Sequence, residues 1–135
     1  MTAKPVVLIA DDHPDILELV SLTLELDGYE VVQARDGEEA LRIASERRLH
    51  LAVLDLMMPG MDGYEVTRRL RADDPERMLP ILILSAFAED RQAALALDAG
   101  ADAYMRKPFS PRELLATAGS MIVRRHPHGR LAARA

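Results

Sequence analysis

Side chains that can bind a cation and a phosphoryl group stand at the ends of four apolar runs of the sequence. Asp11 and Asp12 follow VVLIA, Asp55 follows LAVL, Ser85 follows ILIL, and Lys107 comes shortly after ADAYM. If these runs are parallel strands, the five side chains meet at the carboxyl edge of one sheet, where open α/β sheets bind ligands. The sequence therefore predicts a crevice for a divalent cation and a phosphoryl group.

The three carboxylates favour a hard metal ion. Like charges held close together in a partly dry crevice disfavour each other's ionisation, so a cation is expected among them. Oxygen ligands without histidine or cysteine suit a hard ion, and Mg²⁺ fits, with water and a substrate phosphate completing the octahedron. His13 adjoins the acids, but Pro14 follows it, and we interpret His13 as a residue that starts a helix, not as a ligand.

Phosphoryl transfer to a carboxylate requires a nucleophile, a metal ion, and donors for the phosphoryl oxygens. Asp55 is predicted to be the nucleophile because a pliant loop, LMMPGMDG, follows it, whereas Asp11 and Asp12 form a metal-holding pair. Ser85 and Lys107 supply the hydroxyl and the ammonium. Of 17 basic residues only Lys4 and Lys107 are lysine, which indicates that position 107 needs a compact ammonium.

Each of these residues also has an ordinary structural interpretation. An aspartate after a strand commonly forms a turn or caps a helix, and Ser85 can cap the helix that follows it. Tyr104 is interpreted as partly buried packing, and Met57 as flexible filling. The functional interpretation depends on the agreement of residue types across four strand ends.

Five strands are expected to alternate with helices. Helix starts and stops follow from Pro14, from Gly28, and from acid or serine caps at Asp36, Asp62 and Ser110. Pro59 and Gly60 suit the centre of a type II turn. This alternation predicts a doubly wound α/β sheet with right-handed crossovers. The expected strands, in chain order, are Val6–Ala10, Tyr29–Val32, Leu51–Leu54, Ile81–Leu84 and Ala101–Met105. The fourth helix is expected over Glu89–Ala99.

Composition limits the classes of function. The chain has 135 residues, no cysteine and no apolar run long enough to cross a bilayer, so we expect one cytoplasmic domain without a secretory signal. Residues 124–135 carry four arginines and no acid and are expected to form a flexible basic tail. Residues 1–123 then have a net charge of −9, which disfavours binding to nucleic acid.

The motifs VLIADDHP, VLDLMMPGMDGYE, ILILSA and GADAYMRKPF resemble those of receiver domains of two-component response regulators, over about residues 6–122. The resemblance implies a flavodoxin-like sheet of order 2-1-3-4-5 with five helices. It implies that Asp55 accepts a phosphoryl group from a histidine kinase or a histidine phosphotransfer protein. It further implies that Mg²⁺ is bound by Asp55 and by Asp12, by Asp11 through water, and by the backbone carbonyl of Met57.

The resemblance also implies a switch. Ser85 would bind the phosphoryl group, Lys107 would pair with it, and Tyr104 would turn inward, so that the face made by the fourth helix, fifth strand and fifth helix signals to a downstream protein. The domain would work alone or as part of a longer regulator, as a monomer or as a phosphorylation-dependent dimer. It would catalyse its own phosphorylation and slow dephosphorylation without being a turnover enzyme, and Phe87 with Met57 is expected to shield the acyl phosphate from water.

Other classes of function fit less well. A haloacid-dehalogenase-like phosphatase has two aspartates separated by one intervening residue after the first strand. Here Asp11 and Asp12 are adjacent, and Asp55 lies on another strand. A flavin or nucleotide module needs a glycine-rich loop, and DDHPDI has none. A receiver-like interaction module that works without phosphorylation stays open as the alternative.

Overall fold

A computed structural model describes residues 3–86 and 90–125, which form one five-stranded parallel sheet with five helices. The strand order is β2-β1-β3-β4-β5, so the expected flavodoxin-like topology is confirmed. The elements are β1 (Val6–Ala10), α1 (Pro14–Leu26), β2 (Glu30–Ala34), α2 (Gly37–Glu46), β3 (Leu51–Asp55), α3 (Gly63–Ala72), β4 (Ile81–Ser85), α4 (Asp90–Ala99), β5 (Ala103–Arg106) and α5 (Pro111–Arg125).

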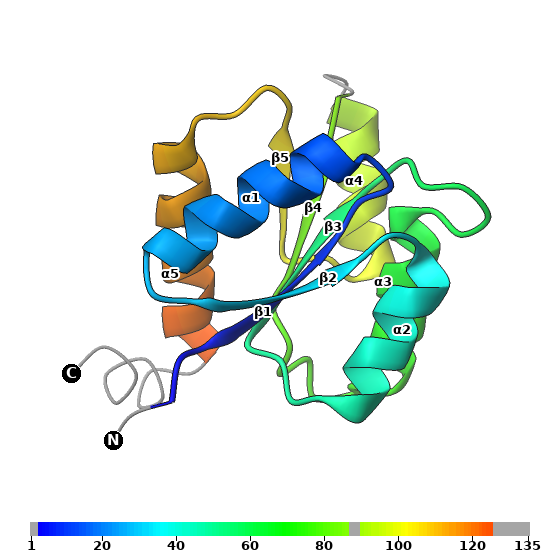
Figure 1. Ribbon diagram of the computed structural model, residues 1–135. Coiled ribbons are helices and arrows are strands. Elements are labelled where there is room, and N and C mark those ends of the chain that lie inside the picture. The colour runs from blue at the N-terminus through cyan, green and yellow to red at the C-terminus, as the bar shows by residue number, and fades with distance from the viewer. Residues whose placement is uncertain (1–2, 87–89, 126–135) are drawn as a thin grey trace.

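Helices cover both faces of the sheet (Figure 1). On one face α1 and α5 pack against β1 and β3 through an apolar cluster that includes Leu17, Leu24 and Leu114. On the other face α2, α3 and α4 pack through a second cluster that includes Ala40, Val66 and Ala96. Because β1, β3 and β4 are buried along their whole length, their sequences are continuously apolar. Among the described residues, none of the helices combines the length and apolarity that a membrane span requires.

The two edge strands differ from the sequence expectation in their bounds. β2 continues to Ala34 because Gln33 and Ala34 pair with Ile9 and Ala10 of β1, although Gln33 interrupts the apolar run. β5 begins only at Ala103. The two residues before β5 are not part of the strand. Ala101 is buried, and a carboxylate oxygen of Asp102 accepts a hydrogen bond from the backbone N–H of Ile81.

Helix capping follows the residue types of the sequence. Asp36 accepts a hydrogen bond from the N–H of Glu39 at the start of α2, and Asp62 accepts one from the N–H of Glu65 at the start of α3. The Oγ atom of Ser110 accepts one from the N–H of Glu113 in the same way. Each cap satisfies a backbone donor that the first helical turn leaves unpaired.

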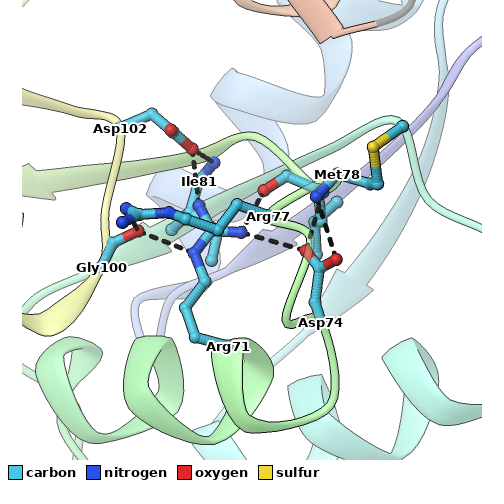
Figure 2. A network of polar contacts seen from close by, with 8 residues as sticks. Arg71, Asp74, Arg77, Met78, Ile81, Gly100 and Asp102 are labelled. Carbon is cyan, nitrogen blue, oxygen red and sulfur yellow. Dashed lines mark hydrogen bonds and ion pairs between the residues drawn. The ribbon is translucent and has the colours of Figure 1, made fainter.

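A network around Arg71 joins the segments at the amino edge of the sheet (Figure 2). From the last turn of α3, Arg71 donates to a carboxylate oxygen of Asp102 at 2.7 Å, to one of Asp74 at 3.1 Å and to the carbonyl oxygens of Leu79 and Gly100. Gly100 has φ +115°, and a Cβ there would lie 2.7 Å from Arg71 Cγ. A glycine after α4 therefore leaves room for the arginine that fixes the α4–β5 connection.

Candidate functional site

Two aspartates lie side by side at the carboxyl edge of the sheet. Asp11 directly follows β1, and Asp55 is the last residue of β3. β1 and β3 are neighbouring parallel strands in which Ala10 pairs with Leu54. Asp11 follows Ala10 and Asp55 follows Leu54, so the two carboxyl groups lie at the same edge of the sheet. Both aspartates are buried, with exposed fractions of 1% and 4%.

Lys107 completes this acidic pair from beyond β5. Its Nζ atom donates to Asp55 Oδ1 at 2.9 Å and to Asp11 Oδ2 at 3.2 Å. The backbone N–H of Lys107 donates to the carbonyl oxygen of Ser85 at 2.7 Å, which brings the ends of β4 and β5 together. The structure thus gathers Asp11, Asp55, Ser85 and Lys107 at one edge, as the sequence predicted from the order of the strands.

Burial and charge compete at this site. Burial raises the pKa of Asp55, the hydrogen bond from Lys107 opposes that effect, and the charge of Asp11 adds to it, so the pKa of Asp55 is raised overall. For Lys107, burial lowers the pKa, but the hydrogen bonds and charges of Asp55 and Asp11 together outweigh burial, and the pKa of Lys107 is raised. The ionised Asp55 therefore lacks full compensation, and an additional cation would stabilise it.

Asp12 and His13 extend the cluster beyond the buried pair. Ligand atoms of Asp11, Asp12, His13 and Asp55 all lie within 4.8 Å of one another, an arrangement that can hold a metal ion. Asp12 Oδ1 is shielded from solvent and forms no hydrogen bond with any residue of the described ranges, and His13 Nδ1 lies 3.2 Å from it. A carboxylate oxygen without a hydrogen bond, beside two further acids, fits a divalent cation, because oxygen ligands of this kind suit a hard ion.

His13 is the residue before α1, as the sequence predicted, but its side chain does not cap that helix. Its ring lies against the acids instead, and the carboxylates of Asp11 and Asp12 raise the pKa of His13. The helix-start interpretation was therefore right about the position of the backbone and missed the position of the ring. Adjacency to two aspartates was the available signal.

The loop after β3 is fixed by a close approach of α3. A Cβ on Gly63 would lie 2.8 Å from the carbonyl oxygen of Asp55, and the N–H of Gly63 donates to the carbonyl of Leu56 at 2.8 Å. Between these points Gly60 has φ +80°, in agreement with the turn expected at that position, and the side chain of Met57 is exposed. Gly63 directly follows the predicted cap at Asp62, but its close approach to β3 was not predicted.

Ser85 and Tyr104 lie on the adjacent strands β4 and β5. Ser85 ends β4 and is buried, and Tyr104 pairs with Ile83 on β5 and is half-buried against the α2–α3–α4 cluster. The packing interpretation of Tyr104 agrees with this position. Phe87, which was expected to shield the site, lies outside the described residues.

The sheet order and a lysine bridging two buried aspartates at the carboxyl edge define a receiver-type α/β domain. The chain belongs to the response regulator receiver domain family, whose model matches residues 7–118. Members of this family accept a phosphoryl group on an aspartate and bind Mg²⁺ at the acidic pocket. They are signalling modules, not turnover enzymes.

Curated relatives are longer regulators. The chain is 45% identical over 118 residues to the alkaline phosphatase synthesis transcriptional regulatory protein PhoP of Bacillus subtilis, covering 87% of this chain and 48% of PhoP. It is 40% identical over 115 residues to the DNA-binding response regulator MtrA of Mycolicibacterium smegmatis, covering 85% of this chain and 49% of MtrA. The chain thus spans about half the length of these relatives.

Solved structures agree over nearly the whole domain. The chemotaxis protein CheY4 of Vibrio cholerae superposes with a TM-score of 0.84 at 35% identity, covering 88% of this chain and 99% of CheY4. The receiver domain of the Francisella response regulator 1452 gives a TM-score of 0.84 at 33% identity, covering 90% of this chain and 98% of that domain. The match is therefore to complete receiver domains.

Proposed function

We propose that Asp55 is the phosphoryl acceptor of this receiver domain and that the donor is a phosphohistidine of a histidine kinase or a histidine phosphotransfer protein. The observation that carries the proposal is the pair of hydrogen bonds from Lys107 Nζ to Asp55 Oδ1 and Asp11 Oδ2. A buried carboxylate with an ammonium beside it has both the nucleophile and the cation that phosphoryl transfer requires.

In the proposed reaction an oxygen of Asp55 attacks phosphorus, the P–O bond forms and the P–N bond of the donor breaks. The leaving imidazole keeps the electron pair of the broken bond and departs neutral because its other nitrogen carries a proton. Lys107 moves from pairing with a free carboxylate to pairing with a phosphoryl oxygen, and the hydroxyl of Ser85 donates a hydrogen bond to a second phosphoryl oxygen.

Mg²⁺ is the proposed cofactor. The residues to hold it are Asp12, Asp55, the carbonyl oxygen of Met57, and Asp11 through water. The fit is supported by the orphaned Asp12 Oδ1 and by the oxygen donors around it. When bound, the ion neutralises charge on the acids and on the transferring group.

We further propose that the surface formed by α4, β5 and α5 reports the phosphorylated state to a downstream protein. Tyr104 on β5 packs against the α2–α3–α4 cluster, so inward rotation of its ring would change the contacts beneath α4. Leu95 and Leu97 are exposed on different sides of α4, so each offers a separate apolar contact for a partner or for a phosphorylation-dependent dimer. PhoP, one of the relatives, is a transcriptional regulatory protein by name. We also propose a cytoplasmic location for this domain.

The test is intact-mass analysis after incubation with a small acyl phosphate and Mg²⁺. The expected result is one added phosphoryl group, which is absent from Asp55→Asn and retained in Asp73→Asn, an exposed carboxyl at the end of α3. Omission of Mg²⁺ should abolish the addition. A phosphoryl group that persists in Asp55→Asn, or none in the unmodified chain, would instead support an interaction module that works without phosphorylation.

A further inference from the structure

The imidazole of His13 occupies a position beside the acids that its backbone role does not explain. His13 is the N-cap residue of α1, yet its side chain accepts no capping hydrogen bond. The Nδ1 atom lies 3.1 Å from Asp11 Oδ1 and 3.2 Å from Asp12 Oδ1. The side chain of His13 is thus directed toward the cluster and not toward the helix terminus.

Backbone contacts hold the ring at this place. The N–H of His13 donates to Asp11 Oδ1 at 2.9 Å, and Pro14 fixes the first turn of α1. Asp11 presents its other oxygen, Oδ2, to Lys107. One carboxylate oxygen therefore faces the ammonium while the other faces the imidazole, which leaves the side of the cluster with Asp12 for a cation.

The separations match those of ligands around one ion. Neighbouring ligands of an octahedral ion with bonds of about 2.1 Å lie about 3 Å apart. Both Nδ1 distances have that value, and the four ligand atoms fall within the 4.8 Å span noted above. A hydrogen bond between His13 and Asp11 would have a similar length, and metal titration distinguishes such a bond from shared ligation of an ion.

We propose that His13 is a nitrogen ligand of the cation site, which raises the affinity of the site for transition-metal ions such as Co²⁺ or Zn²⁺ relative to its affinity for Mg²⁺. The proposal rests on the proposed function only in sharing its cation site. Imidazole binds these ions well and Mg²⁺ poorly, and carboxylates accept both. A set of three carboxylates and one imidazole is therefore a mixed donor set in which Mg²⁺ uses the oxygens alone.

The inference is tested by pulsed electron paramagnetic resonance of the full chain loaded with Mn²⁺, at a pH where imidazole is neutral. His126 and His128 are replaced by alanine in every protein, because imidazoles outside the described residues also bind such ions. The expected spectrum contains the coupling of one directly bound nitrogen, which disappears in His13→Ala and in His13→Gln. Asp12→Ala should weaken Mn²⁺ binding, which locates the ion in the cluster.

Calorimetric titration gives a second measurement. The ratio of the Mg²⁺ to the Co²⁺ dissociation constants should fall roughly tenfold or more in His13→Ala. Two results would overturn the inference and leave the proposed function intact. One is Mn²⁺ binding that Asp12→Ala weakens but that shows no nitrogen coupling, and the other is an unchanged ratio of dissociation constants in His13→Ala. Failure of that function is seen separately, as the absence of Asp55-dependent phosphoryl addition with Mg²⁺.

Discussion

Replacing Arg71 by methionine tests whether the network at the amino edge of the sheet stabilises the domain. Methionine keeps much of the aliphatic stem, so the change removes mainly the guanidinium and its hydrogen bonds. The carboxylates of Asp74 and Asp102 each lose one charged partner, and two carbonyl oxygens lose a donor. Figure 2 shows how these groups surround the arginine.

The magnitude follows from burial. The side chain of Arg71 is 10% exposed, and its partners Asp74 and Asp102 are 20% and 15% exposed. Removing one member of a buried ion pair costs about 3–5 kcal/mol, and partial access of water to both acids places this case at the lower end. For a domain of this size a loss of about 3 kcal/mol lowers the melting temperature by roughly 10 °C.

Urea unfolding followed by circular dichroism measures the free energy of unfolding. The matched control is Arg68→Met on the same helix, since Arg68 pairs with Glu65 at 3.1 Å but both side chains are well exposed, at 57% and 39%. Its expected cost is below about 0.5 kcal/mol. Equal losses in the two variants would refute the argument that burial of the Arg71 network determines its contribution.

Three further outcomes are expected. In metal-free buffer Asp55→Asn raises the free energy of unfolding at neutral pH, because burial raises the pKa of Asp55 and so disfavours the ionised carboxylate in the folded state. Urea unfolding should show this gain shrinking as the pH falls through the raised pKa and vanishing below the ordinary carboxyl pKa; no gain at neutral pH contradicts it. Gly63→Ala lowers the free energy of unfolding by about 1–3 kcal/mol, because the added Cβ would lie 2.8 Å from the carbonyl oxygen of Asp55. Gly119→Ala is the control, since its Cβ would meet its nearest neighbour at an ordinary contact distance of 3.7 Å. Equal melting temperatures for the two variants would contradict this prediction. Tyr64→Phe removes a hydroxyl donor from α3 to Gln92 of α4, at a net cost of about 1 kcal/mol, and should speed amide hydrogen exchange in α4, so unchanged exchange would count against it.

The strands and the meeting of the acids were predictable from short-range signals, whereas the strand order followed from the resemblance to receiver domains. Continuous apolar runs mark strands covered on both faces, and an acid at the end of such a run must lie at the carboxyl edge. That reasoning placed Asp11, Asp55 and Lys107 together although they are far apart along the chain. The bounds of β2 were missed because pairing with β1 overrides the polarity of Gln33.

Contacts between distant segments were not predictable in the same way. Arg71 and Asp102 are 31 residues apart, and nothing local in either segment indicates that their side chains meet. Such contacts depend on packing of whole elements, which a single sequence does not reveal.

The position of the Arg71 network has a consequence for protein engineering. It lies at the start of β4 and β5, whereas Asp55 lies at the end of β3, and five-residue strands separate the two edges by roughly 17 Å. At this separation the interaction of two unit charges is at most about 1 kcal/mol for an effective dielectric constant of about 20, so charges at one edge have little effect on the other. Thermostability and phosphoryl acceptance can therefore be optimised independently, at opposite ends of the same strands.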